Sequence, residues 1–551
     1  MSRKPRSKVQ KTPEISGVDK PTSQAWAWIL LTAVALFTAV VRIRLLQTPL
    51  ERDEGEFGYM GQLILQGIPP YKIACNMKLP GTYAMYALFL KIFGNSVAGI
   101  HLGLMTMNLI SIVLVFLLAR RLLGPLAAVV AGASFGLLSV IPSVLGTSAH
   151  ATQYVLPFAL GGIILMLRAI DSGKTSTLAL SGLLLGISFL MKQHAVFFLA
   201  FALLYFIRTQ ARKATPGGLA RRAGILSAAM ALPFAITCLI LIKLGVFQKF
   251  WFWTFTYAGA YTSENNMSQG LMMFRQAMRD VTEHSIWLWV LGGMGLTSIA
   301  WGKRAKANGV FLVGFLVFSF LTMCPGMYFR PHYFIAFLPA LSLLIGAAVS
   351  SGADVLRRVG IYRVLPIVLF TALLAHLVFL ERGFLFEVSP SDASIIMYDG
   401  PGFVAMEQVG EYVRAHTKAT DKIVMFGSDP ELYFYAQRRA GTTFLYTYGL
   451  VEIHKYAASM QQEMMKEIMK SQPEIVVISN LGGSWLVRPG CDRTIFNWAN
   501  AYFPANYEAE GIAEFLPRRF TAYMWGDNVK GYAPRAKNYL LVIRRLHPSS
   551  H

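Results

Sequence analysis

The sequence predicts a polytopic α-helical membrane protein that carries a small α/β domain at its C-terminus. Hydrophobic residues make up 54% of the 551 residues and charged residues only 15%, whereas a soluble domain carries about a quarter charged residues. A chain this apolar could not cover its own surface, so the bilayer must be part of its solvent. The apolar residues form about eleven segments of membrane-spanning length, and short β-branched runs alternating with helical patterns follow only after the last of them.

The N-terminal residues 1–25 are polar and basic, and they predict a disordered cytoplasmic tail. The run 26–46 is long enough to cross ~30 Å of hydrocarbon and lacks the small-residue cleavage site of a signal peptide. We therefore expect it to be a retained first span that enters from the cytoplasm. Further spans are expected at 96–119, 124–142, 150–168, 175–191, 193–208, 223–244, 284–301, 309–324, 331–349 and 363–380. The shorter apolar stretch 79–93 should lie in the interface or dip partway into the membrane.

Lys and Arg gather in short stretches between the apolar segments. These stretches are Arg3 to Lys11, Arg120–Arg121, Arg208 to Arg222, Lys303 to Lys306 and Arg357 to Arg363. Basic residues in short loops mark the cytoplasmic side, and threading eleven spans in order places all five stretches there. The net charge of +22 is thus explained by topology, which argues against nucleic-acid binding and favours a multi-pass protein of the cell membrane.

Two long loops within the transmembrane region 26–380 should lie outside the cytoplasm, at 47–95 and 245–283. The second loop opens with a cluster of aromatic residues: Phe247, Phe250, Trp251, Phe252, Trp253, Phe255 and Tyr257. This cluster is either an aromatic belt at the lipid–water interface or a platform for a prenyl chain or a sugar ring. Residues 381–551 are expected to form the extracytoplasmic α/β domain. Cys75 and Cys491 would both lie outside the membrane, where spacing alone does not decide whether they form a disulfide.

Carboxylates are scarce near the outer membrane face. Between Phe57 and Ser263 the only acidic residue is Asp171, which lies in a predicted cytoplasmic turn. The acids that the membrane region can offer on the outer side are Glu51, Asp53, Glu54, Glu56, Glu264, Asp280 and Glu283. Placing four of these next to a bilayer is costly unless they have a function.

Asp53 has two interpretations. It could cap a helix that begins near Glu54, because acids are favoured in the first turn. Alternatively, it is an ionised carboxylate that faces a cavity at the lipid interface, where it is suited to act as a general base on an alcohol.

Five segments resemble the GT-C membrane glycosyltransferases, specifically the protein O-mannosyltransferase and aminoarabinose-transferase-like group with its RgtA/B/C/D-type bacterial members. That group has an Asp-Glu pair just after the first span, where this chain has Asp53 and Glu54. The other matching segments are LPGTYAMYALFLKIFG, GLLLGISFLMKQHAVFFL, YFRPHYFIAFLPALSLL and, near the C-terminus, DKIVMFGSDPELYFYAQRRAGTTFLY. The resemblance implies a GT-C-like fold. It also favours a bacterial inner membrane, since the eukaryotic enzymes usually carry an inserted lumenal domain.

The resemblance also implies a reaction. The donor is a sugar on a polyprenyl phosphate, whose phosphate leaving group needs cationic stabilisation. By this resemblance Asp53 and Glu54 are the catalytic residues, Asp53 as the base and Glu54 supporting it. The candidate partners of the donor phosphate are Lys78, Lys192, Arg330 and His332. A second acid, if one is needed, is expected from Glu264, Asp280 or Glu283.

The chain departs from this group at two places. Met77 stands where the aminoarabinose transferases have a Glu near a metal, and His150 and Gln153 stand where many bacterial members have an acid. We therefore assign no metal or other cofactor.

The leading hypothesis is transfer of a sugar from a polyprenyl-phosphate donor to a lipid, glycan or protein acceptor outside the cytoplasmic membrane. A transporter or flippase for a lipid or lipid-linked glycan is the alternative, and a scaffolding membrane protein is a third interpretation. The transporter predicts charged groups deep within spans, which the sequence almost lacks.

Overall fold

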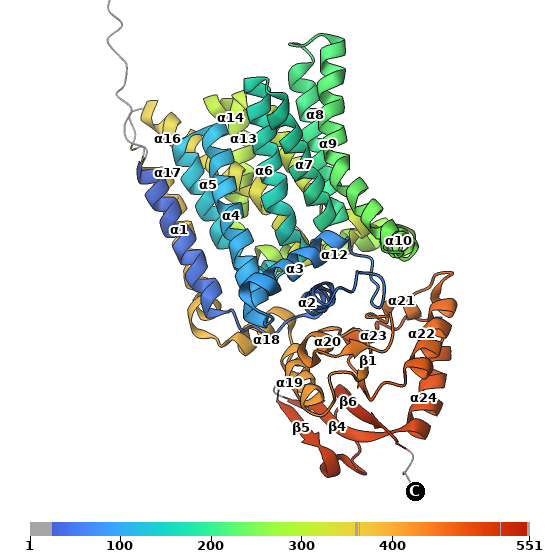
Figure 1. The fold of residues 1–551 in the computed structure, drawn as a ribbon. Coiled ribbons are helices and arrows are strands. Elements are labelled where there is room, and N and C mark those ends of the chain that lie inside the picture. Colours follow the sequence, from blue (N-terminus) through green and yellow to red (C-terminus); the bar gives the residue numbers. More distant parts are fainter. Residues whose placement is uncertain (1–24, 359–361, 363, 518–519, 548–551) are drawn as a thin grey trace, which may run out of the picture.

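The structure is a computed structural model that describes residues 25–358, 362, 364–517 and 520–547. A bundle of long helices forms one half, and a sheet with its helices lies beyond one end of the bundle (Figure 1). The predicted N-terminal tail falls outside the described residues, except for Ala25.

Each predicted span overlaps one bundle helix, although the span predicted at 331–349 starts later, at Leu338, and ends later, at Arg358. These helices are α1 (Ala25–Arg44), α4 (Val97–Leu123), α5 (Pro125–Leu138), α6 (Ala151–Ser172), α7 (Thr175–Met191), α8 (Val196–Gln210), α9 (Pro216–Lys243), α13 (Ile286–Trp301), α15 (Gly309–Leu321), α16 (Leu338–Arg358) and α17 (Leu365–Leu380). Of these, α1, α4, α6, α9 and α16 are long and apolar enough to cross a membrane. Since several others are shorter, the number of crossings stays a prediction.

Local sequence explains where the bundle helices turn. The Ser96 side chain caps α4 by accepting from the Gly99 amide, and Gly124 ends α4 with a φ of 98°, a conformation that glycine adopts without strain. Pro125 then occupies the first position of α5, where its missing N–H costs no hydrogen bond. A second break in the helical backbone lies at Lys192. This residue takes an extended conformation between α7 and the short helix η2 (Gln193–Ala195).

Basic residues tie the helix ends together at the bundle end away from the sheet. Arg304, on the short helix α14 (Lys303–Ala307), donates to the Leu123 carbonyl at the end of α4. Arg121 pairs with Asp171 at 2.5 Å, and Arg222 donates to the Ala169 carbonyl at the end of α6. The described basic stretches therefore gather at one end, as they would on the cytoplasmic side.

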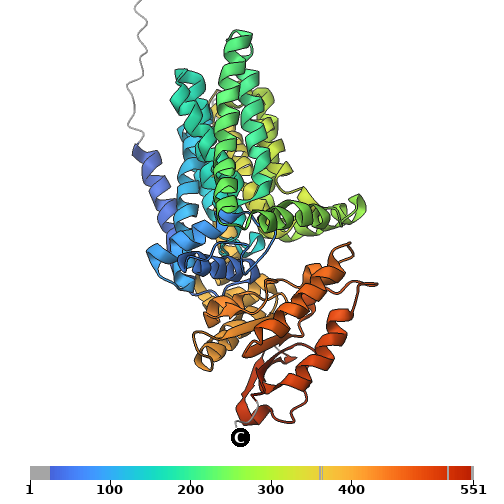
Figure 2. The same ribbon diagram turned by 45° about the vertical axis from the view of Figure 1, so that its right-hand side comes forward.

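The opposite end of the bundle is covered by helices from the two long loops (Figure 2). They are α2 (Arg52–Leu65), α3 (Pro80–Phe93), α10 (Phe247–Trp251), the π-helix η3 (Phe252–Tyr257), α11 (Ala258–Thr262) and α12 (Met267–Thr282). The stretch expected at the interface is α3, which packs against α2 across the bundle end rather than continuing through it. The cap of α2 is Glu51 and not Asp53: its side chain accepts from the Glu54 amide, and Glu54 accepts from the Glu51 amide in return. The capping interpretation of Asp53 is therefore wrong.

All named strands of the described residues lie in the C-terminal part and form one six-stranded sheet of order β2-β1-β3-β6-β4-β5. The strands are β1 (Lys422–Phe426), β2 (Arg439–Ala440), β3 (Ile475–Ser479), β4 (Tyr507–Phe515), β5 (Thr521–Trp525) and β6 (Tyr539–Arg545). Pairings among β1, β2 and β3 are parallel, and the remaining pairings are antiparallel. Its helices are α18 (Pro390–Tyr398), α19 (Gly402–Ala415), α20 (Glu431–Ala436), α21 (Tyr448–Val451), α22 (Ala457–Ser471), α23 (Gly482–Trp485) and α24 (Thr494–Asn506).

The C-terminal part contacts α2 directly. The Leu50 amide donates to the Tyr435 hydroxyl, and the Ala440 amide donates to the Tyr59 hydroxyl, both at 2.8 Å. Gly55 lies so near α20 that a Cβ built on it would fall 2.2 Å from Glu431 Cβ. Leu50 and Tyr435 are 385 residues apart in the sequence. The C-terminal part is thus packed against α2 although the two are distant in the chain.

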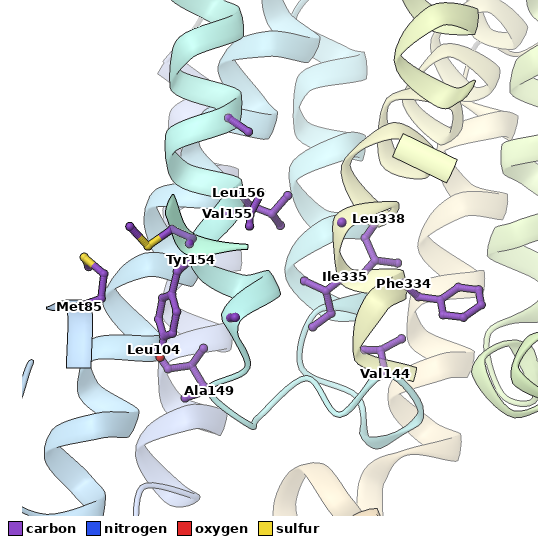
Figure 3. Packing of buried hydrophobic residues seen from close by; sticks show 14 of the residues in the cluster. Met85, Leu104, Val144, Ala149, Tyr154, Val155, Leu156, Phe334, Ile335 and Leu338 are labelled. Atoms are coloured by element: carbon purple, nitrogen blue, oxygen red, sulfur yellow. The ribbon is translucent and has the colours of Figure 1, made fainter. Parts of the chain in front are cut away.

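Two irregular segments complete this end of the bundle. One runs from η1 (Pro142–Val144) into α6, and the other runs through η4 (Pro325–Met327) and η5 (Pro331–Ala336) into α16. Figure 3 shows Val144 of the first segment beside Phe334 and Ile335 of the second, whereas Ala149 lies apart from them, near Tyr154. This apolar packing fixes the backbone on either side of His150 and His332.

Candidate active site

A cavity of about 680 Å³ lies where the loop helices, the bundle end and the C-terminal part meet. Its walls come from residues 51–53 and 75–78 of the first loop, 189–197 at the α7–α8 break, 253–262 of the second loop, 325–333 before α16, and 444–460 of the C-terminal part. Of the residues that the sequence predicts for the site, the cavity brings together Asp53, Lys78, Lys192, Arg330 and His332.

Asp53 is held from two sides in the first turn of α2. Its Oδ2 lies 3.1 Å from Lys78 Nζ, and its Oδ1 accepts from the Tyr446 hydroxyl at 3.1 Å. Burial opposes ionisation of Asp53, but Lys78 and His150 outweigh it and hold its pKa well below the usual range. Asp53 is therefore a carboxylate at neutral pH, and 22% of its side chain remains exposed toward the cavity.

Glu54 supports the site from behind. Its side chain is 1% exposed and does not border the cavity. Its Oε1 accepts from the Ala149 amide at 2.5 Å and contacts His101 Nε2 at 3.1 Å. Since Ala149 precedes His150, Glu54 fixes the position of that imidazole relative to Asp53. This geometry agrees with the supporting role expected of Glu54 and not with direct contact to a substrate.

The four expected phosphate partners differ in their contacts. Lys78 is paired with Asp53, whereas the described partners of Lys192 and Arg330 are neutral. Lys192 Nζ donates to Thr152 Oγ1 at 3.0 Å and lies 3.9 Å from the centroid of the Tyr333 ring. Arg330 lies over the ring of Tyr328 at 5.5 Å. These two cations are the ones available to an anion in the cavity.

Burial has an electrostatic consequence at Lys192. Desolvation, together with the nearby positive charge of Lys78, holds the pKa of Lys192 well below its usual value. An anion placed beside the Lys192 side chain would oppose both effects and raise this pKa again.

His150 and His332 stack face to face, with ring centroids 3.8 Å apart and planes 13° apart. His150 was noted in the sequence only as a departure from the related enzymes. Both of its ring nitrogens are buried without a hydrogen-bond partner among the described residues, and Nδ1 lies 3.5 Å from Glu51 Oε1 and 3.9 Å from Asp53 Oδ2. Its place at the start of a span was the only sequence signal for its role.

Ligand atoms of Asp53, His150 and His332 lie within 4.8 Å of one another. Two imidazoles and one carboxylate form a donor set that suits a divalent transition metal, and the unpartnered nitrogens of His150 fit such a ligand role. This convergence was not expected from the sequence, which assigned no metal. The pairing of Asp53 with Lys78 shows that a cation already partners one of the three ligands.

The expected second acids lie elsewhere. Glu264 accepts from the Tyr328 hydroxyl at 3.0 Å and from Arg488 at 2.6 Å, so it links the second loop to the C-terminal part. Asp280 is exposed and accepts from Gln276 at 3.3 Å, and Glu283 is exposed at the end of α12. Among the described residues, none of the three lines the cavity wall.

Carboxylates other than the three expected second acids lie at or near the cavity. Glu51 and Glu452 border the cavity, and burial raises the pKa of each to about 7. Glu56 lies one turn beyond Asp53, accepts from Asn76 at 2.6 Å and from Tyr83 at 2.7 Å, and has its pKa raised by burial to about 8. The helical spacing of Asp53 and Glu56 was visible in the sequence, but nothing there linked Glu452 or Tyr446 to the first loop.

The aromatic cluster of the second loop is divided between two roles. Trp253, Phe255 and Tyr257 border the cavity, whereas Phe250 is buried and Trp251 is 45% exposed. Trp253, Phe255 and Tyr257 are therefore placed where a platform would be needed and Trp251 where a belt would be, and both functions stay predictions. The cysteines are all free in the structure, so Cys75 and Cys491 do not pair.

Comparisons with known proteins agree with this architecture. The family model described as dolichyl-phosphate-mannose-protein mannosyltransferase matches residues 78–241, a stretch that contains Lys78 and Lys192 but not Asp53. No curated protein sequence matches the chain.

Solved structures match over nearly the whole chain. ArnT from Cupriavidus metallidurans, crystallised with undecaprenyl phosphate, is 15% identical with a TM-score of 0.59, and the match covers 95% of this chain and 98% of that one. The oligosaccharyltransferase AglB from Archaeoglobus fulgidus, solved with an inhibitory peptide and a dolichol-phosphate, is 13% identical with a TM-score of 0.53, covering 96% and 77%. The chain therefore has the fold of the GT-C membrane glycosyltransferases, the group that its sequence motifs resemble.

Proposed function

We propose that the protein is a glycosyltransferase that moves a sugar from a polyprenyl-phosphate donor to a lipid, glycan or protein acceptor. One observation carries this proposal: a single cavity at the bundle end presents an ionised carboxylate, Asp53, together with the cations Lys192 and Arg330, whose described partners are neutral. The carboxylate suits the acceptor hydroxyl, and the cations suit the donor phosphate.

In the proposed reaction the acceptor hydroxyl displaces the polyprenyl phosphate at the anomeric carbon of the sugar. The acceptor oxygen forms a bond to the anomeric carbon while its proton passes to Asp53. The bond between that carbon and the phosphate oxygen breaks, and the electron pair leaves with the polyprenyl phosphate. Lys192 and Arg330 stabilise the negative charge that develops on the leaving phosphate. Tyr446 and Lys78 hold the Asp53 carboxylate in place.

The polyprenyl chain would fit against an apolar part of the cavity wall. Phe189, Val196, Phe197 and Phe255 line one side of it, and Val196 is 45% exposed, which is ordinary for a side chain that meets lipid. The likeness to an ArnT structure that holds undecaprenyl phosphate supports a lipid-linked donor.

The proposal also covers the domain organisation and the orientation of the protein in the membrane. Residues 26–380 form the membrane-embedded catalytic part, and residues 381–551 form an extracytoplasmic α/β domain that completes the cavity through Tyr446 and Glu452. In this proposal the protein resides in a bacterial inner membrane, with its N-terminus on the cytoplasmic side. The gathering of basic residues at the far end of the bundle supports this orientation.

The test is a panel of polyprenyl-phosphate sugars incubated with purified protein, with consumption of the donor as the readout. We expect the wild type to consume one donor and Asp53→Asn to lose at least 100-fold in rate, since loss of a general base costs about 10²–10⁴-fold. Asp280→Asn is the matched control, because Asp280 is exposed and bonded only locally among the described residues. Full activity of Asp53→Asn would remove Asp53 as the base, and a transporter would consume no donor at all.

A chelation arm separates the two roles that Asp53 could play. Activity that survives exhaustive EDTA treatment supports direct proton transfer to Asp53. Activity that disappears and returns with Mn²⁺ or Zn²⁺ assigns Asp53, His150 and His332 to a divalent cation instead. In that case the His150→Ala variant should also lose activity.

A further inference from the structure

A second large cavity lies far from the active site, at the basic end of the bundle. Its volume is about 930 Å³, and it forms a groove between α1 and α17 with α5 as its floor. None of its lining residues borders the active-site cavity. The proposed glycosyl transfer uses none of them, so the groove needs its own explanation.

The groove walls are apolar along their length. On α1 the lining residues recur with helical spacing at Trp26, Leu30, Val34 and Phe37, and on α17 they recur at Ile367, Phe370, Leu374 and Val378. The twelve helical residues from Trp26 to Phe37 span eleven steps along the helix axis, or about 16 Å. This is roughly half of the ~30 Å hydrocarbon thickness, so the groove matches the depth of one membrane leaflet.

One end of the groove is strongly cationic. Lys303 and Arg304 on α14, together with Arg357 and Arg358 on α16, line it beside a single carboxylate, Asp354. Arg304 contacts a neutral group, the Leu123 carbonyl, at 3.0 Å. Trp26, which is 40% exposed, lies at the same end, where an amphipathic ring is typical of the lipid–water interface.

We propose that this groove is a binding site for an anionic phospholipid. The acyl chain lies between α1 and α17 against α5, and the phosphate headgroup sits on the Lys303, Arg304, Arg357 and Arg358 side chains. Charge complementarity decides the ligand class, because basic pockets at the cytoplasmic ends of membrane helices favour anionic headgroups. A zwitterionic lipid would fill the apolar part equally well but would leave the excess positive charge unpaired.

The test measures lipid binding to the purified full-length protein by native mass spectrometry. Dioleoyl phosphatidylglycerol and dioleoyl phosphatidylethanolamine share the same chains and differ in headgroup charge. We expect the wild type to retain phosphatidylglycerol preferentially. The triple variant Lys303→Gln/Arg357→Gln/Arg358→Gln should bind phosphatidylglycerol at least ten-fold more weakly, since it loses three of the four basic side chains that would attract the anionic headgroup.

Two further variants keep the result specific. Arg212→Gln/Lys213→Gln/Arg221→Gln removes the same charge from exposed residues at the α8–α9 turn, outside the groove, and should bind phosphatidylglycerol as the wild type does. Ala33→Phe fills the groove from the exposed side of α1 without changing charge, and should weaken binding of both lipids.

Equal retention of the two lipids by the wild type, or unchanged binding by the first triple variant, would overturn the proposal. So would a concentration-dependent dimer that Ala33→Phe abolishes, since the occupant would then be a second copy of the chain.

Discussion

Lys192 carries a buried amino group whose described partners are a threonine hydroxyl and a tyrosine ring. Because burial and Lys78 depress its pKa, it gains most from an anion in the cavity. Lys192→Met keeps the length of the side chain and removes the charge. We expect the Kd for a polyprenyl phosphate to rise roughly ten- to hundred-fold, as a charge-assisted hydrogen bond contributes about 1.5–3 kcal/mol.

The measurement is lipid-phosphate binding to purified protein, which needs no knowledge of the sugar. Lys243→Met is the matched control, since Lys243 is exposed at the end of α9 and does not line the cavity. Equal affinity of the wild type and Lys192→Met would show that Lys192 serves only to snorkel toward the interface.

Glu56 gives the protein a pH-dependent stability. Its pKa rises from an ordinary 4.5 to about 8 because burial disfavours the carboxylate, so the folded state holds a proton that the unfolded state has released. The free energy of unfolding therefore falls as pH rises from about 4.5 to about 8, and the loss is complete above that value. Glu56→Gln mimics the neutral acid and should remain more stable than the wild type at pH 8.

Thermal unfolding in detergent, followed by tryptophan fluorescence at several pH values, checks this prediction. Other buried acids titrate in the same window, so the informative quantity is the difference in Tm between the two proteins. That difference should grow from pH 5 to pH 8. A constant difference would mean that Glu56 is ionised throughout or stabilised by a cation.

At the level of elements, α2 is the part on which the site depends, and its position rests on a close approach to α20. A Cβ at Gly55 would meet the Cα of Glu431 at 2.3 Å, and backbone cannot yield as a flexible side chain can. Gly55→Ala should therefore destabilise the protein by about 1–3 kcal/mol through overpacking and lower activity by displacing Asp53. Gly293→Ala on α13, where an added Cβ meets nothing within 4 Å, should be neutral or slightly stabilising in the same unfolding assay.

The elements show where sequence patterns were sufficient. Each apolar segment that the sequence marks as a span overlaps a bundle helix, because burial in lipid requires long apolar stretches with internally paired backbones. The break at Lys192 and the separate helix at Pro80–Phe93 were also anticipated. The cap of α2 was misassigned by two residues, since Glu51 and Asp53 are both acids near the same helix start.

For the whole molecule, the basic residues and the acidic site lie at opposite ends of the bundle, which predicts opposite sides of the membrane. In a cysteine-free background, Lys213→Cys should be protected from a membrane-impermeant maleimide in spheroplasts, and Lys470→Cys should be labelled. Both positions are exposed in the structure. Disrupting the membrane should expose Lys213→Cys as well. Labelling of Lys213→Cys in intact spheroplasts would contradict the proposed orientation.

The sequence by itself determined the class of protein, the bundle helices and the candidacy of Asp53, because composition, apolar periodicity and the scarcity of outer-face acids are properties of the chain alone. It also singled out Lys192 and Arg330 as cations at the outer ends of spans. The tertiary structure decided how these residues are partnered. It paired Lys78 with Asp53, placed Glu54 behind the site, stacked His150 on His332 and brought Tyr446 and Glu452 to the cavity. Those contacts join residues tens to hundreds of positions apart, and no local pattern encodes them, since they follow from how α2 packs between the bundle and the sheet.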